Sequence, residues 1–136
     1  MDRVLVAIDD SREARDALKY ALEQFSDATI HVIHVPEVPS VSFDMAPDSS
    51  MTDQAEDQAA DILESAREIA SERGRTVETD VVFGHPAKAT ISYAEDNDIE
   101  QIIVGSRGKG GMKRVLLGSV AETIIRRADC PVTVVR

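Results

Sequence analysis

The apolar residues of the chain follow two periods that alternate along its length. Short, nearly continuous apolar runs, such as residues 4–8 and 101–104, are typical of strands that helices cover on both faces. Between these runs, apolar residues recur every three or four positions, as in helices that bury one side. Strand and helix alternate, with connections long enough for crossovers. The pattern predicts one α/β domain over residues 1–136, a Rossmann-like, doubly wound, five-stranded parallel sheet with helices on both faces.

The predicted strands are residues 4–8, 29–35, 76–83, 101–104 and 132–135. The first helix is predicted to run to Phe25, with Asp10 as its N-cap and Glu13 as the reciprocal partner. The second is predicted over residues 53–73 and the third from Pro86 to residue 96. The last is predicted from Ser119 to about residue 128, opened by a second capping box with Glu122.

The stretch 36–52 lacks a sustained period. It holds three prolines and several serines, which favour a long, exposed connection between the second strand and the second helix. This connection and the acidic surface are the parts of the chain that would suit an unknown protein partner.

Composition excludes several classes of protein. The chain has 136 residues, 43% of them apolar, and no apolar run near the roughly 20 residues of a membrane span. The N-terminus lacks the features of a signal peptide, and the single cysteine, Cys130, excludes an internal disulfide and a multi-cysteine metal site. We therefore expect a cytoplasmic protein without membrane contact.

Charge adds a further expectation. The formal net charge of −10 opposes nonspecific binding to DNA, RNA or anionic lipid, so no nucleic-acid partner is predicted. Acidic residues are in excess and only four of the basic residues are lysines. Two interpretations stay open: a protein adapted to a salt-rich cytoplasm, or an ordinary acidic protein.

Three segments leave the carboxyl ends of predicted strands with polar or glycine-rich residues: Asp9-Asp10-Ser11, His34-Val35 and residues 105–119. In an open parallel sheet, ligands bind beyond these ends, near the point where strand order reverses. We expect the fold to bring the first and third segments together. The three histidines and Cys130 are interpreted as structural or solvated rather than catalytic.

The segment 105–119 carries the strongest chemical signal. Its glycines allow a close backbone approach to a ligand, and its end opens a helix whose free N–H groups favour phosphate. Arg107, Lys109, Lys113 and Arg114 lie there without an acidic residue from position 106 to 117. Tight turns, helix capping or solvation would each explain one of these features alone. The glycines, the helix start and the basic residues together predict an anion site. The spacing fits neither a Walker loop nor the dinucleotide motif.

One known family shares this arrangement. The segment from Gly105 to Ser119 resembles the nucleotide-binding signature of universal stress proteins: Gly105, then two residues, Gly108, then nine residues, and Gly118-Ser119. Four other segments agree with this resemblance: Val6-Ala7-Ile8-Asp9-Asp10-Ser11 near the start, His34-Val35-Pro36, Gly84-His85-Pro86-Ala87, and Ala128-Asp129-Cys130-Pro131-Val132. The resemblance covers essentially the whole chain.

The resemblance implies a regulatory or signalling module in stress response that binds ATP, with ADP or AMP as alternatives. The acidic residue after the first strand would lie beside the nucleoside, the end of the second strand beside adenine, and the glycine segment against ribose and phosphates. Mg²⁺ or Mn²⁺ would be held mostly by phosphate and water, so no protein residue is predicted as a metal ligand. The implied site residues are Ala7, Ile8, Asp9, Val35, Gly105, Arg107, Gly108, Lys109, Gly118, Ser119 and Val120.

The resemblance also implies a homodimer, because family members commonly pair through their last strands. Here that strand is short and apolar and would form an edge: Val132, Thr133, Val134 and Val135.

Three other functions compete with nucleotide binding. A response-regulator receiver fails, because the third strand has no terminal aspartate and Cys130 stands where a lysine is required. No nucleophile and base are positioned as a pair, so we predict a protein that is not an enzyme, with slow ATP hydrolysis as an alternative. A protein-interaction module that nucleotide does not gate is the other alternative.

Overall fold

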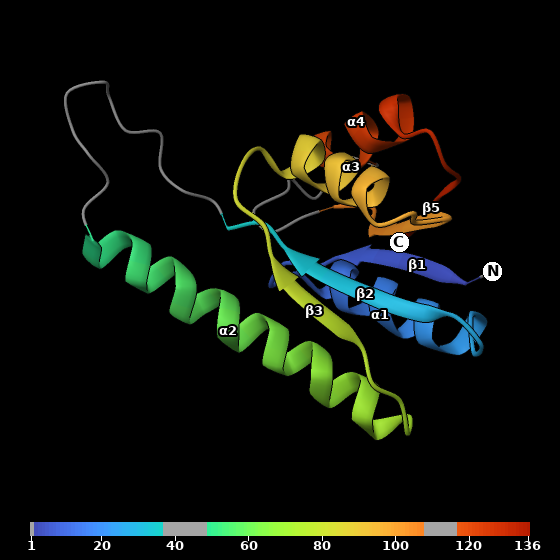
Figure 1. The fold of residues 1–136 in the computed structure, drawn as a ribbon, viewed down its shortest axis with the longest axis horizontal. Helices are drawn as coiled ribbons and strands as arrows, with labels where there is room; N and C mark the ends of the chain where they lie inside the picture. Colours follow the sequence, from blue (N-terminus) through green and yellow to red (C-terminus); the bar gives the residue numbers. More distant parts are fainter. Residues whose placement is uncertain (1, 37–48, 108–116) are drawn as a thin grey trace.

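The computed structural model of the protein describes residues 2–36, 49–107 and 117–136 (Figure 1). In this part of the chain, five parallel strands form one sheet in the order β3-β2-β1-β4-β5. The predicted doubly wound α/β fold is confirmed. The elements are β1 (Arg3–Ala7), α1 (Arg12–Gln24), β2 (Thr29–His34), α2 (Ser49–Glu72), β3 (Glu78–Val81), α3 (Pro86–Asp96), β4 (Gln101–Gly105), α4 (Ser119–Arg127) and β5 (Val132–Val135).

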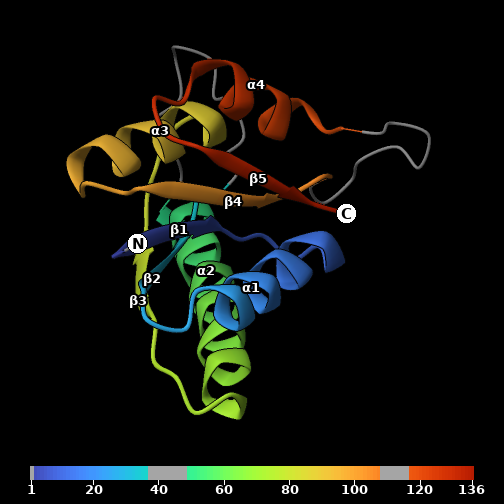
Figure 2. The same ribbon diagram turned by 90° about the vertical axis from the view of Figure 1, so that its right-hand side faces the viewer.

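Helices cover both faces of the sheet. Helices α1 and α2 pack on one face and α3 and α4 on the other, as the edge-on view in Figure 2 shows. Alternate residues of one strand supply both cores, since Val4 and Val6 of β1 face α1 and α2 while Leu5 faces α3 and α4. All three are fully buried, which explains why the sequence of a central strand is apolar without alternation.

The order in which strands are added to the sheet reverses beside β1, although all the strands are parallel. The chain moves outward from β1 to β2 and β3, then returns to put β4 on the other side of β1. The segments that follow β1 and β4 therefore leave the sheet next to each other and lead to helices on opposite faces. This arrangement opens a crevice at the carboxyl ends of the two strands.

The N-cap of α1 differs from the prediction. Ser11, not Asp10, is the capping residue, and its hydroxyl oxygen accepts a hydrogen bond from the Ala14 N–H at 3.1 Å. The prediction was wrong by one residue because aspartate and serine are comparable caps and Ser11 lies where its backbone is extended (φ −84°, ψ 155°).

Two other boundaries also differ. Helix α2 begins at Ser49, inside the stretch 36–52 that was predicted to be a connection, since residues 49–53 contain no proline or glycine. The rest of that predicted connection, residues 37–48, lies outside the described residues. Strand β3 is shorter than residues 76–83, because it is an edge strand that pairs only with residues 31–34 of β2.

Other expected boundaries are confirmed. Gly74 ends α2 with a positive φ of 68°, and Asn97 is the C-cap of α3. None of the helices in the described ranges is long and apolar enough to span a bilayer.

Candidate functional site

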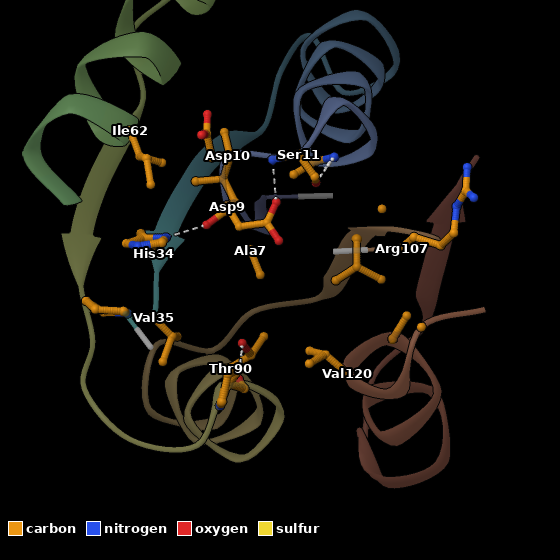
Figure 3. A pocket seen from close by; sticks show the side chains of 18 of the residues that line it. Ala7, Asp9, Asp10, Ser11, His34, Val35, Ile62, Thr90, Arg107 and Val120 are labelled. Atoms are coloured by element: carbon orange, nitrogen blue, oxygen red, sulfur yellow. Dashed lines mark hydrogen bonds between the residues drawn. The ribbon is translucent and has the colours of Figure 1, made fainter. Parts of the chain in front are cut away.

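A cavity of about 660 Å³ lies at the carboxyl ends of β1, β2 and β4 (Figure 3). The three segments predicted to carry chemistry meet in its wall: residues 7–11, 34–36 and 105–107. Residues 118–121 at the start of α4 complete the wall on one side. Side chains of α2 and α3 close it elsewhere: Ala55, Gln58, Ile62, Pro86 and Thr90.

Every predicted site residue that the structure describes lines this cavity. Gly108 and Lys109 lie outside the described residues. The others come together from four separate segments: Ala7, Ile8, Asp9, Val35, Gly105, Arg107, Gly118, Ser119 and Val120.

The start of α4 forms one end of the cavity. Gly118 is the N-cap, with no side-chain cap, so the predicted capping box of Ser119 and Glu122 is wrong: Ser119 is already the first helical residue. The Gly118 N–H donates to the Ser106 carbonyl at 2.6 Å, and the Gly118 carbonyl accepts from the Glu122 N–H at 2.9 Å. The backbone N–H groups of the first helical turn have no acceptor within the helix, so they give this end of the cavity a partial positive charge.

The segment after β1 presents a carboxylate. Asp9 is half-buried, and its Oδ1 accepts a hydrogen bond from the Ser11 N–H at 2.8 Å (Figure 3). This turn fixes the Asp9 carboxylate in the cavity wall before α1 begins. Asp10 is exposed, and its Oδ1 lies 3.6 Å from Nη1 of Arg15.

The opposite end of the cavity is mostly apolar. Val35 and Pro36 follow β2 there, and Ile62 reaches it from α2. Two polar side chains of this end are buried. The Thr90 hydroxyl donates to the Pro86 carbonyl at 2.7 Å, and His34 Nδ1 lies 2.8 Å from the Ile8 carbonyl oxygen.

His34 was not among the predicted site residues, although a signal for it exists. Alternation along β2 places Ile30, Val32 and His34 on one face of the sheet, so a histidine follows two fully buried apolar residues toward the carboxyl end. A polar side chain that ends such a row lies at the rim where ligands bind. The residues of α2 and α3 carry no comparable signal.

Arg107 makes a contact that the sequence did not predict. Its Nη2 donates to Oε1 of Glu13 at 3.0 Å, and the two side chains are 31% and 20% exposed. In Figure 3 its guanidinium points away from the middle of the cavity. The pair ties the segment after β4 to the first turn of α1.

A second hollow, of about 820 Å³, lies between β3 and α3. Its lining includes Phe83, Lys88 and Tyr93, but also the carboxylates of Asp80 and Asp96. Neither Gly105 at the end of β4 nor Gly118 at the start of α4 lines it. The start of α4 opens into the first cavity and not into the second, so the first cavity is the stronger candidate for an anion although Asp9 and Asp10 line it.

Metal-ligating side chains do not gather in the described ranges. Across residues 2–36, 49–107 and 117–136, no group of three or more His, Cys, Asp or Glu side chains could hold a metal ion.

Known proteins resemble the chain over its full length. The family model described as the universal stress protein family matches residues 1–136. The chain is 31% identical over 139 residues to a universal stress protein of Methanocaldococcus jannaschii, across 98% of this chain and 81% of that protein. It is 32% identical over 151 residues to one of Bacillus subtilis, across 99% of each.

Solved structures share the fold. The universal stress protein UspA of Lactobacillus plantarum superposes with a TM-score of 0.87 at 24% identity, over 99% of this chain and 97% of that chain. A universal stress protein in complex with cAMP has a TM-score of 0.74 at 25% identity, over 99% and 97%. One from Archaeoglobus fulgidus in complex with dAMP has a TM-score of 0.74 at 23% identity, over 100% and 98%.

Proposed function

The chain belongs to the universal stress protein family, and from this premise we propose that it binds an adenine nucleotide in the cavity at the carboxyl ends of β1, β2 and β4. ATP is the proposed ligand, with ADP and AMP as alternatives. The bound nucleotide would act as the input of a regulatory or signalling module in stress response. The observation that carries this proposal is the start of α4, which has a glycine N-cap and opens into the cavity.

Phosphate groups fit the α4 end of the cavity. Gly118 has no side chain to keep an anion away from the backbone, and the N–H groups that follow it are unused within the helix. Ser119 is exposed and adds a hydroxyl that can donate to a phosphate oxygen. Helix N-termini of this kind bind phosphate through both hydrogen bonds and the helix dipole.

The nucleoside fits the other part of the cavity. The Asp9 carboxylate lies in the cavity wall, and a carboxylate accepts several hydrogen bonds, so it can accept one from a ribose hydroxyl. Beyond it, Val35, Pro36 and Ile62 provide apolar walls for a flat base. The order from α4 to β2 therefore matches the order of phosphate, ribose and base in a nucleotide.

Two relatives by fold support the class of ligand, since one is in complex with cAMP and the other with dAMP. For a triphosphate we propose that Mg²⁺ or Mn²⁺ accompanies it and is held mostly by phosphate oxygens and water.

Nucleotide binding without turnover stays a prediction, as does the alternative of slow hydrolysis. Saturable release of phosphate from bound ATP would contradict the prediction, whereas release at the rate of free ATP would support it.

Calorimetric titration of ATP tests the proposal, with Mg²⁺ present and at high salt. The Gly118→Val variant places a branched side chain where phosphate would approach the backbone, and we expect it to lose binding. Thr123→Val is the matched control, because Thr123 lies on the same helix, donates to the Ser119 carbonyl at 2.9 Å and does not line the cavity. Absence of ATP binding by the wild type, in protein free of carried-over nucleotide, would refute the proposal.

A further inference from the structure

We propose that His34 selects the base: its Nε2 accepts a hydrogen bond from the exocyclic amine of adenine. This inference rests on the proposed function and adds the residue that distinguishes adenine from other purines. Three observations carry it: the partner of Nδ1, the access of Nε2 to the cavity, and the position of His34 relative to the phosphate end.

The hydrogen bond of Nδ1 determines the tautomer of the ring. Nδ1 of His34 lies 2.8 Å from the Ile8 carbonyl oxygen, in a buried contact. A carbonyl oxygen can only accept, so Nδ1 carries the proton. In the neutral ring, Nε2 is then an acceptor with a lone pair.

Nε2 is open to the cavity. It has no hydrogen-bond partner among the described residues. In the same part of the chain, no fully buried side-chain nitrogen or oxygen lacks a partner, so Nε2 must reach open space. His34 is only 8% exposed and lines the cavity, and from this we infer that the open space that Nε2 reaches is the cavity.

His34 lies at the end of the cavity that suits a base. Figure 3 shows His34 on the same side as Ile62 and Val35, with Val120 of α4 on the opposite side. A ligand with its phosphates at α4 would direct its base toward this side. The base would meet apolar walls and, between them, one buried acceptor.

An acceptor in this position discriminates between purines. Adenine carries an amino group at C6, which donates to Nε2, whereas hypoxanthine and guanine carry an oxygen there, whose lone pairs would face the lone pair of Nε2. A purine with hydrogen at C6 would leave Nε2 without a partner. Sites that hold a buried polar group select strongly against analogues that cannot pair with it.

The test compares three ligands by calorimetric competition: AMP, purine riboside 5′-monophosphate, which lacks the 6-amino group, and IMP. We expect the wild type to bind AMP about five- to tenfold more tightly than purine riboside monophosphate, and IMP no better than the latter. His34→Phe keeps a flat ring of similar size and should abolish the preference. His31→Phe is the control, because His31 lies on the same strand, contacts Tyr93 instead and does not line the cavity.

The possible results separate the two proposals. Equal binding of AMP and purine riboside monophosphate by the wild type would overturn the role of His34 alone, and so would an unchanged preference in His34→Phe. No binding of any nucleotide would overturn the proposed function as well. If His34→Phe does not fold, ¹⁵N spectra of histidine-labelled wild type decide: the Nε2 resonance of His34 should shift with AMP and not with purine riboside monophosphate.

Discussion

A β-carbon on Gly105 would lie 2.7 Å from the backbone carbonyl carbon of Glu13 and 2.9 Å from the backbone nitrogen of Ala14. The end of β4 therefore packs directly against the first turn of α1, with no room for a side chain between them. Because the atoms it would meet belong largely to the helix backbone, a rotamer change cannot relieve the overlap. Gly105 is required for the packing of a strand and a helix that form adjacent walls of the cavity.

The first prediction follows from this contact. Gly105→Ala should lower the free energy of unfolding by about 1 to 3 kcal/mol, the usual cost of overpacking. Gly118→Ala is the matched control, because Gly118 has φ −70°, which any residue adopts, and should cost less. Urea unfolding of both variants measures the difference. A Gly105→Ala protein as stable as the wild type would show that α1 can move away from β4.

Much of this cavity was predictable from the sequence because its walls come from strand ends. A continuous apolar run identifies a central strand, and the residues after it must lie at the ligand-binding edge, so Asp9, Val35 and Gly105 could be named without a structure. The predicted helix start at the end of the glycine segment indicated Gly118 and Ser119, and the structure brings these residues next to the strand ends.

Other parts of the site could not be predicted, for two physical reasons. Ile62 and Thr90 reach the cavity only through the packing of α2 and α3, which no local pattern specifies. The choice between neighbouring caps depends on energy differences of about 1 kcal/mol or less, which explains why Ser11 rather than Asp10 caps α1.

The second prediction concerns pH. Burial lowers the pKa of His31, an effect that Glu78 opposes and Arg3 reinforces. The pKa of His31 in the folded protein therefore lies below its ordinary value of about 6.5. The unfolded chain binds a proton at this residue more readily than the folded protein does. Stability associated with His31 is therefore fully present above that value and is lost as pH falls toward the lower folded pKa.

Urea unfolding at about pH 8 and about pH 5.5 tests this in the wild type and in His31→Gln. The variant also loses the contact with Tyr93, which shifts its stability at both pH values, so the readout is the change between them. We expect a smaller decline in the variant. An equal decline would assign the pH dependence to other groups, such as the carboxylates.

The third prediction is a homodimer through β5, which forms one edge of the sheet. The other edge, β3, carries exposed Glu78 and Asp80, which discourage pairing with another strand, whereas β5 is apolar apart from Thr133. The Pro131 carbonyl accepts a hydrogen bond from Ile102 N–H of β4, and the Val135 carbonyl accepts one from Ser106 N–H just after β4. Alternation along β5 therefore turns the N–H of Val134 away from β4.

Val134→Pro should therefore block pairing at this edge without removing a hydrogen bond within the chain. Sedimentation equilibrium is expected to give a dimer for the wild type and a monomer for the variant. Val81→Pro on β3 is a comparison at the opposite edge and should leave the dimer in place. A monomeric wild type at high concentration would reject the prediction.

The fourth prediction concerns salt and separates the two interpretations of the acidic composition. Helix α2 carries one basic residue, Arg67, which lies 3.0 Å from Glu64. The acidic residues of the same helix are all exposed: Asp53, Glu56, Asp57, Asp61, Glu64, Glu68 and Glu72. Repulsion along such a surface destabilises the folded state. Salt screens this repulsion, with a Debye length of about 10 Å at 0.1 M.

If this repulsion is part of an adaptation to high salt, the thermal midpoint should rise steadily from low to molar KCl. The variant Glu56→Gln/Asp57→Asn/Asp61→Asn removes three of the charges while keeping side chains of the same size, so its midpoint should be higher at low salt and should rise less. Differential scanning calorimetry measures both trends. A flat response in the wild type would favour an ordinary acidic protein, because the charges would then be far enough apart in solvent to cost the folded state little.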